Sequence, residues 1–339
     1  MELREEIMEK DHSRLNKHPQ LVTDLKVLNI IIKEIPNFVS ISAKQAWTKK
    51  IHASSAAIDI STACNLRCVH CYVYRNEKVP YEFNRLSQMS DEEWIARIER
   101  LKKEHPHINH VTWVGGEPLM KRELLRKGTT LFKYNWIITN GTLPIPEDFE
   151  NTTLIISLDG PEEYHDQIRG KDVYSRAKNN IMKTKANVYA HCVINSKNKD
   201  SIEKLVEEWI GTNLKGIRFS FHTPEYGVED PLWLSADERD NIVKQISMLK
   251  EKYGNFIWMT KIEIEALKSE NQLKVFGDNC LLKNGANISL DNKGDVKKPC
   301  VMGPTADCNR CGCTVPPMLY AIAKKNHIPT ALNLAKSFC

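Results

Sequence analysis

The sequence predicts an α/β fold, a partial (β/α)6 barrel followed by a small cysteine-rich C-terminal region. Three observations lead to this prediction. Six short apolar segments alternate with helical patterns between residues 56 and 251. Polar or glycine-containing motifs follow each of the first four segments, where barrels of this class place functional residues. After about residue 255 the alternation stops, and five cysteines gather between residues 280 and 313.

Each strand is predicted from a short apolar run bounded by turn residues, and each helix from apolar residues at three- and four-residue intervals. The predicted strands are Ala56–Ile60, His110–Val114, Trp136–Thr139, Leu154–Leu158, Val188–Ile194 and Ile217–Phe221. The predicted helices cover about Asp91–Lys103, Lys121–Phe132, Tyr174–Lys185, Ile202–Ile210 and Asp237–Glu251. Regular alternation of this kind predicts a parallel sheet with right-handed crossovers.

Three units are expected along the chain. Residues 1–50 form an N-terminal helical extension, residues 51–254 the barrel and residues 255–339 the cysteine-rich region. In the last unit, the turn residues Asp291–Asp295 between two short runs predict a hairpin that starts with a strand at Ala286–Leu290. The helix in the first unit is predicted over residues 18–36 from apolar residues at helical spacing, namely Leu21, Leu25, Leu28, Ile31 and Ile32.

The composition excludes several classes of protein. The 48 basic and 43 acidic residues give a net charge of +5, and the lysines are scattered, so no nucleic-acid partner is expected. No run of 18 apolar residues predicts a membrane span, and the first residues lack the apolar stretch of a signal peptide. The ten cysteines cluster at metal-like spacings in a long chain, which favours thiolate ligands in the cytoplasm over disulfides.

The first cysteines, Cys64, Cys68 and Cys71, stand four and three residues apart directly after the first predicted strand. Three thiolates on one short loop suit a cubane iron–sulfur cluster whose fourth iron has no protein ligand. An open coordination position invites a substrate or cofactor, whereas a closed four-ligand site favours structure or electron transfer. A structural zinc loop is the alternative for these three residues.

Three further motifs end the following strands. They are Gly115-Gly116-Glu117-Pro118, Thr139-Asn140-Gly141 and Ser157-Leu158-Asp159-Gly160. Glycines let the backbone approach a ligand closely, and a carboxylate can accept hydrogen bonds from a ligand's ammonium group. Taken singly, each motif also fits an ordinary strand-to-helix turn.

Together with the cysteine triplet, these motifs resemble those of radical SAM enzymes over about residues 54–225. The resemblance implies a [4Fe–4S] cluster on Cys64, Cys68 and Cys71 whose open iron is chelated by S-adenosylmethionine (SAM). It also implies reductive cleavage of SAM to methionine and a 5′-deoxyadenosyl radical, which abstracts hydrogen from a substrate. An electron donor such as flavodoxin or ferredoxin is the implied partner. The family often has an aromatic residue before the third cysteine, where this chain has His70.

The resemblance also implies a SAM pocket, while no catalytic side chain is identified. Arg169 matches an arginine often found near the SAM carboxylate, because its planar fork suits carboxylates, although a surface ion pair is the alternative. The implied pocket residues are Gly115, Gly116, Glu117, Pro118, Thr139, Asn140, Ser157, Asp159, Arg169 and Asn195.

The C-terminal cysteines are similar to a SPASM or twitch-type auxiliary-cluster region. The candidate ligands are Cys280, Cys300, Cys308, Cys311 and Cys313. Five exceed the four that one cluster needs, so we expect a single twitch-like auxiliary [4Fe–4S] cluster and one spare cysteine. Zinc on four of these thiolates is the alternative. Cys192 lies inside a predicted buried strand and is interpreted as a core residue.

The substrate stays open at this stage. An auxiliary cluster suggests maturation of a peptide, as in RiPP biosynthesis, or oxidation of a small molecule. The order of the motifs is also similar to adenosylhopane synthase-like enzymes, which implies addition of the radical to a lipid or isoprenoid alkene as an alternative. A non-catalytic iron–sulfur electron carrier or redox sensor is the alternative from another class.

Overall fold

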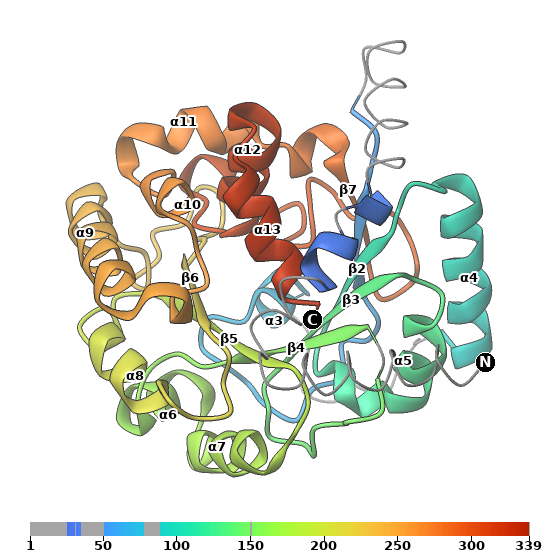
Figure 1. Ribbon diagram of the computed structural model, residues 1–339, viewed down its shortest axis with the longest axis horizontal. Coiled ribbons are helices and arrows are strands. Elements are labelled where there is room, and N and C mark those ends of the chain that lie inside the picture. The colour runs from blue at the N-terminus through green and yellow to red at the C-terminus, as the bar shows by residue number, and fades with distance from the viewer. Residues whose placement is uncertain (1–25, 31, 35–50, 78–88, 150, 339) are drawn as a thin grey trace, which may run out of the picture.

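The computed structural model describes residues 26–30, 32–34, 51–77, 89–149 and 151–338. Their centre is a seven-stranded, wholly parallel sheet in the order β6-β5-β4-β3-β2-β1-β7, which curls into a half barrel (Figure 1). The six predicted strands are all confirmed to within two residues. Their bounds are β1 (Ser55–Asp59), β2 (His110–Val114), β3 (Tyr134–Thr139), β4 (Thr152–Ser157), β5 (Val188–Ile194) and β6 (Ile217–Phe221).

Helices cover the outside of the curved sheet and join successive strands, except that no helix lies between β3 and β4 among the described residues (Figure 1). The five predicted helices are found, and Ser90 and Ser235 start two of them with capping boxes, which explains where α4 and α9 begin. The helices of this layer are α3 (Tyr72–Glu77), α4 (Asp91–Glu104), η2 (Pro118–Lys121), α5 (Arg122–Thr129), α6 (Glu162–Arg169), α7 (Val173–Lys183), α8 (Ile202–Trp209) and α9 (Ala236–Tyr253).

The sheet is buried on both faces, as expected for parallel strands. On the outer face, Trp94, Trp113 and Trp209 belong to the large apolar core between the sheet and the helices. On the inner face a smaller core forms around Trp136 and Trp258. The two apolar layers pack against the faces of the sheet and fix its curvature. The polar motifs lie outside these layers, at the carboxyl ends of the strands.

The C-terminal region supplies the inner layer. Helices α12 (Val315–Lys325) and α13 (Ile328–Lys336) contribute Met318, Leu334 and other apolar side chains to the inner core. The indole of Trp136 donates to Ser337 Oγ at 3.3 Å, which places the end of the chain near the amino ends of the strands. The shorter helices of this region are η3 (Gly254–Phe256), α10 (Lys261–Glu265), η4 (Ser269–Asn271), α11 (Gln272–Val275), η5 (Gly277–Asn279), η6 (Leu282–Ala286) and η7 (Cys308–Arg310).

The predicted hairpin is confirmed, and its first strand joins the main sheet. Strand β7 (Asn287–Leu290) pairs in parallel with β1, in the register Ala57 to Ser289. The chain then turns at Asp291 and returns through a bridge between Leu290 and Val296. The cysteine-rich region therefore shares the sheet of the preceding residues, which the sequence did not predict.

The described part of the N-terminal extension, residues 26–30 and 32–34, is helical. Its buried side chain is Val27, whereas Leu28 and Ile32 are about half exposed, so the predicted apolar stripe is wrong at these two positions. The helix packs through Glu34, which accepts hydrogen bonds from Asn109 and Tyr134 at the amino ends of β2 and β3. Leu21, Leu25 and Ile31 lie outside the described residues.

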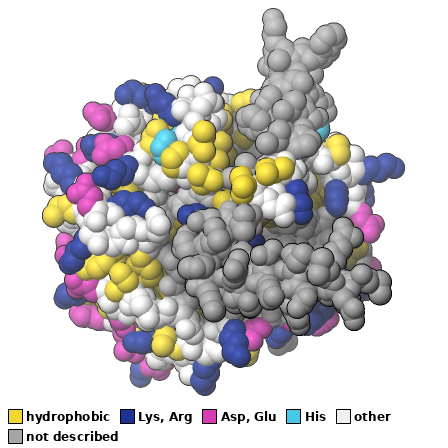
Figure 2. All heavy atoms as spheres, in the orientation of Figure 1, with side chains coloured by type: hydrophobic (Ala, Val, Ile, Leu, Met, Phe, Trp, Pro, Cys, Tyr) yellow, Lys and Arg dark blue, Asp and Glu magenta, His cyan; other side chains and the backbone are white. Residues whose placement is uncertain are grey.

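The surface agrees with the mild net charge. Positive and negative side chains are intermixed around the outer helices on the face shown in Figure 2. In the part of the chain that the structure describes, no helix is long and apolar enough to cross a membrane.

Candidate functional site

The loop between β1 and α3 presents Cys64, Cys68 and Cys71 at the carboxyl end of the sheet. A backbone hydrogen bond from Cys71 to Cys68 closes its second half at 3.2 Å. The amide of Val69 donates to the carbonyl of Ile168 in α6 at 2.9 Å. The second cysteine interval is therefore fixed by a local contact and by a helix about 100 residues further along the chain.

Two glycines allow the end of β2 to lie directly against this loop. The amide of Gly116 donates to Ser61 O at 2.6 Å, and the amide of Glu117 donates to Ala63 O at 2.8 Å. A Cβ at Gly116 would lie 2.0 Å from the carbonyl oxygen of Ala63. No side chain fits there, so the glycine pair is required to build the wall beside the cysteine loop.

Glu117 joins the ends of β2 and β3. Its carboxylate accepts from the Thr139 hydroxyl at 2.7 Å, from the Asn140 amide at 2.8 Å and from the Leu119 amide at 3.0 Å. The side chain is buried, and burial raises its pKa. Pro118 follows it at the start of η2. In this structure Glu117 is thus an anchor that sets the position of the Thr139-Asn140-Gly141 turn.

Asn140 continues this chain of contacts to the first cysteine. Its side-chain amide lies 3.9 Å from Cys64 Sγ and donates to Asn65 Oδ1 at 2.9 Å. Its carbonyl oxygen accepts from the hydroxyl of Thr142 at 2.7 Å. An amide donor beside a cluster thiolate is the kind of outer contact that tunes an iron–sulfur site.

Asp159 organises the other side of the loop. Its carboxylate accepts from Arg169 Nε at 2.6 Å, from His70 Nε2 at 3.2 Å and from the Val193 amide at 2.9 Å. Although burial opposes its ionisation, the charge of Arg169 holds the pKa of Asp159 well below its usual range. Asp159 is completely buried, and both of its oxygens are occupied by these protein donors.

Arg169 stands at the end of α6, a helix that the sequence analysis did not predict as such. Its guanidinium lies between Asp159 and the cysteine loop, with Nη1 3.9 Å from Cys68 Sγ. The interpretation of Arg169 as an exposed surface ion pair is therefore wrong, because the side chain is 9% exposed and its carboxylate partner is completely buried.

The last two implied pocket residues differ from each other. Ser157 ends β4 on the inner face beside His191 of β5 and is partly exposed. Asn195 is fully buried in the turn after β5, where its side chain donates to Val193 O at 3.1 Å and accepts from the Lys197 amide at 2.9 Å. In this structure the side chain of Asn195 shapes the turn that follows β5.

Two histidines near the loop have unused ring nitrogens. His70 Nδ1 and His165 Nε2 are buried and have no hydrogen-bond partner among the described residues. His165 Nδ1 accepts from the Asp159 amide at 3.2 Å, and burial lowers the pKa of His165 to about 3. Sequence reasoning noted His70 only as a departure from a family pattern and missed His165. Only the spacing of His165 and Arg169, one helical turn apart, could have indicated that both face one site.

The five C-terminal cysteines lie together. Burial is the main cause that raises the pKa of Cys300 to about 12 and of Cys313 to about 11, and neighbouring thiols contribute. Cys280 raises the pKa of each of the other four, which places it among them. Gly312, between Cys311 and Cys313, packs against the end of β6, where a Cβ would lie 2.4 Å from the Phe221 carbonyl oxygen.

All nine cysteines among the described residues are free thiols. Within the same ranges, no three or more Cys, His, Asp or Glu side chains are arranged to hold a single metal ion. The donors of the cysteine loop are all thiols, which fits an iron–sulfur cluster. The glycine-lined wall and the unpartnered nitrogens of His70 and His165 fit a polar organic ligand beside it.

The comparisons with known proteins agree with this geometry. The model of the Radical SAM superfamily matches residues 58–208, from β1 to α8. The chain contains a radical SAM domain. This family uses a [4Fe–4S] cluster and SAM, and the match includes the cysteine loop and every implied pocket residue.

Two curated relatives support the assignment. The sporulation killing factor maturation protein SkfB of Bacillus subtilis is 31% identical over 191 residues, which cover 48% of this chain and 45% of SkfB. The serine-type anaerobic sulfatase-maturating enzyme of Bacteroides thetaiotaomicron is 36% identical over 131 residues, which cover 32% of this chain and 30% of that enzyme. The chain thus spans less than half the length of either relative.

The fold of the radical SAM domain and its C-terminal extension is also found in a crystal structure. SuiB of Streptococcus suis bound to S-adenosylmethionine matches with a TM-score of 0.58 and 15% sequence identity. The alignment covers 89% of this chain and 75% of SuiB. The coverage shows that the likeness extends beyond the residues that the family model matches.

Proposed function

We propose that this chain is a radical SAM enzyme that reductively cleaves SAM and abstracts hydrogen from a peptide substrate, in a maturation reaction of the RiPP type. The observation that supports this most is the cysteine loop enclosed by glycines, buried donors and an arginine. The two curated relatives described above have maturation in their names, which supports a gene-encoded substrate over a lipid alkene or a small alcohol.

In this proposal Cys64, Cys68 and Cys71 hold three irons of the cluster. When bound, the cluster supplies the electron that cleaves SAM to methionine and a 5′-deoxyadenosyl radical. Gly115 and Gly116 let the backbone approach the methionine portion of SAM, and Arg169 offers its remaining N–H groups to the SAM carboxylate.

The roles of the anchors follow from their contacts. Glu117 and Thr139 fix the wall opposite the cysteine loop, Asn140 donates toward Cys64, and Asp159 orients Arg169 and His70. Ser157 offers a partly exposed hydroxyl to SAM or substrate from the inner face of the sheet. Preorganised donors of this kind bind a ligand without reorganising.

We also propose a division into an N-terminal extension (1–50), a radical SAM core (51–254) and an auxiliary-cluster region (255–339). Four of Cys280, Cys300, Cys308, Cys311 and Cys313 would bind a second [4Fe–4S] cluster. It would accept the electron left on an oxidised substrate radical or bind the substrate. A flavodoxin- or ferredoxin-type protein would supply electrons, and the reducing cytoplasm would keep the free thiols available.

The deciding experiment is anaerobic reconstitution with iron and sulfide, followed by dithionite and SAM. We expect 5′-deoxyadenosine by mass spectrometry from the natural chain and none from the C64A/C68A/C71A variant. The matched control is C192A, which removes a buried core thiol and leaves both cysteine groups intact. Absence of 5′-deoxyadenosine from a fully loaded natural chain would contradict the enzyme and favour an electron carrier.

The substrate class needs its own readout. Synthetic peptides added to the loaded enzyme should raise 5′-deoxyadenosine formation and change in mass in the same molar amount. An adenosylated lipid formed without free 5′-deoxyadenosine would instead support radical addition to an alkene.

A further inference from the structure

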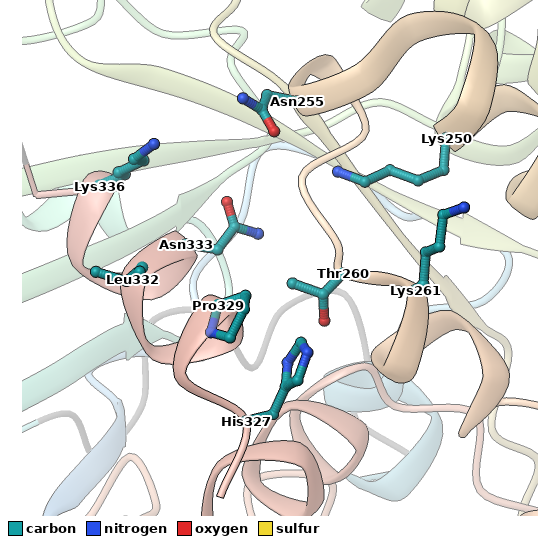
Figure 3. Close-up of a pocket in the computed structure, with 9 residues that line it drawn as sticks. All are labelled: Lys250, Asn255, Thr260, Lys261, His327, Pro329, Leu332, Asn333 and Lys336. Atoms are coloured by element: carbon teal, nitrogen blue, oxygen red, sulfur yellow. The ribbon is translucent and has the colours of Figure 1, made fainter. Parts of the chain in front are cut away.

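A second pocket lies between the end of α9, the start of α10 and helix α13, with a volume of about 420 Å³ (Figure 3). It is at the opposite end of the sheet from the cysteines. Ile257 beside it pairs with Ile217, the first residue of β6, and Ser337 behind it contacts Trp136 near the start of β3. The pocket therefore takes no part in the radical SAM site.

The lining of this pocket is cationic. Lys250, Lys261 and Lys336 contribute to it, and no acidic side chain does so among the described residues. Lys261 is exposed and shares its charge with Glu251 at 3.1 Å. Lys336 has no acidic partner within the ranges that the structure describes. A pocket lined by positive charges raises the local concentration of anions.

Lys250 has donors to spare. Its ammonium makes one hydrogen bond, to Ile257 O at 3.0 Å, so two of its three N–H donors are available. Burial lowers the pKa of Lys250 because it disfavours the charged ammonium group. A bound anion would stabilise that charge. The nearby carboxylate of Glu263 is already used, by Arg218 at 2.7 Å and by the Thr260 amide at 2.8 Å.

Asn333 provides an independent observation. Its Nδ2 atom is buried and has no hydrogen-bond partner among the described residues. Figure 3 shows this amide and the Lys250 ammonium extending into the same space, with Asn255 above them. A buried amide without an acceptor is costly, and an anionic oxygen in the pocket would satisfy it.

We propose that this pocket binds the phosphate group of a small molecule. Lysine binds phosphate as a point charge, whereas planar carboxylates are matched best by the arginine fork, which the described lining lacks. The tetrahedral oxygens of phosphate can accept from ammonium and amide donors that converge from several directions. The volume lies in the range of small-ligand sites and exceeds what the phosphate alone requires.

The test measures binding of inorganic phosphate and pyrophosphate to the full chain by calorimetry at constant ionic strength, with no SAM or reductant present. We expect saturable binding that K250M/K336M weakens by about tenfold or more, because two charge-assisted contacts are lost. The matched control is K103M/K244M, which removes two exposed lysines elsewhere and should leave the affinity unchanged. The charge-preserving K250R/K336R variant should retain most of the binding.

Three outcomes would overturn the proposal: no saturable binding, equal binding by K250M/K336M with an unchanged melting temperature, or tighter binding of citrate than of pyrophosphate. If K250M/K336M fails to fold, the N333L variant tests the proposal instead. It removes the unpartnered amide of Asn333 and leaves the lysines in place. Unchanged phosphate affinity in N333L would then contradict the site. None of these results depends on SAM cleavage, so this proposal and the enzymatic one fail separately.

Discussion

The ammonium of Lys297 lies 2.6 Å from the carboxylate of Asp59, and this pair connects the two cysteine groups. Asp59 ends β1, and its other oxygen accepts from the phenol of Tyr72 at 3.0 Å. Burial is the main cause that raises the pKa of Tyr72 well above its usual range, and the thiols of Cys71 and Cys300 both contribute. Tyr72 directly follows Cys71, and Lys297 precedes Cys300 by three residues, so these contacts join the segments that carry the two cysteine groups.

The first prediction concerns this pair. K297M would leave a buried carboxylate with only a neutral phenol as partner, and we expect a loss of about 3 kcal/mol in the free energy of unfolding by urea. K283M, which breaks an exposed pair with Asp278, should cost less than about 1 kcal/mol. The D59N/K297M double variant should recover part of the loss. Equal effects of K297M and K283M would show that the Asp59 bridge is not structural.

The second prediction concerns the wall beside the cysteine loop. In G116A the new methyl group would collide with the backbone carbonyl of Ala63, so the loop must move, and we expect at least half of the iron at this cluster to be lost. Iron per chain after reconstitution is the measurement. G227A adds a methyl into open space at a positive φ of 71° and should cost only about 1 kcal/mol of strain, with iron retained.

The third prediction concerns His70. Ionised Asp159 can only accept, so His70 Nε2 carries the proton and neutral His70 presents Nδ1 as an acceptor. H70Q keeps a donor for Asp159 and replaces the ring acceptor Nδ1 by a carbonyl oxygen at a different position. We expect the Kd of SAM to rise about tenfold without reductant, at unchanged iron content. An unchanged Kd would show that the free nitrogen does not face SAM.

The fourth prediction identifies the spare cysteine. Burial raises the pKa of Cys308, and Lys283, Cys280 and two carboxylates also influence it. Cys308 is only partly buried, whereas Cys280 is buried. In a C64A/C68A/C71A background, C308A should keep about four irons per chain and C280A should lose them. Zinc in place of iron in both variants would contradict an auxiliary iron–sulfur cluster.

The fifth prediction is a pH dependence. Burial lowers the pKa of His110 to about 4, below the value of an unfolded histidine. The unfolded state therefore binds the proton more tightly, and stability falls as the pH drops from 6.5 toward 4. Between pH 6.5 and 4.5 this one group contributes a loss of about 2 kcal/mol. H110F should lose correspondingly less stability over that interval in urea titrations, and parallel curves for both proteins would contradict this.

Much of the fold could be predicted because its signals are local. The predicted bounds of β2, β5 and β6 are the observed ones. The motifs that follow the strands lie together at one edge of the sheet, as predicted. Helix α6 (Glu162–Arg169) was missed because it is short and carries only two apolar residues, Tyr164 and Ile168, which form a single helical repeat. The partners of Asp159 and the pairing of β7 with β1 depend on contacts across long stretches of chain, which no local pattern records.

The same limit explains the pocket residues. Sequence motifs identified Glu117, Asp159 and Asn195 as polar groups beside a ligand, but the structure shows all three bound to neighbouring protein groups. A motif records which residues a site needs and does not distinguish those that contact the ligand from those that hold the contacting residues. His70 was the opposite case, because a single residue type carried too little information to reveal its unused nitrogen.

The pairing of β7 with β1 has a consequence for synthesis of the chain. Ser55 of β1 and Asn287 of β7 contact each other although 232 residues separate them in the sequence. Until the ribosome releases β7, the nascent chain exposes an unpaired strand edge next to Cys64, Cys68 and Cys71, where a neighbouring polypeptide could add a strand. Cys64, Cys68 and Cys71 are synthesised while that edge is still open, and the edge closes only when the cysteine-rich region has been made.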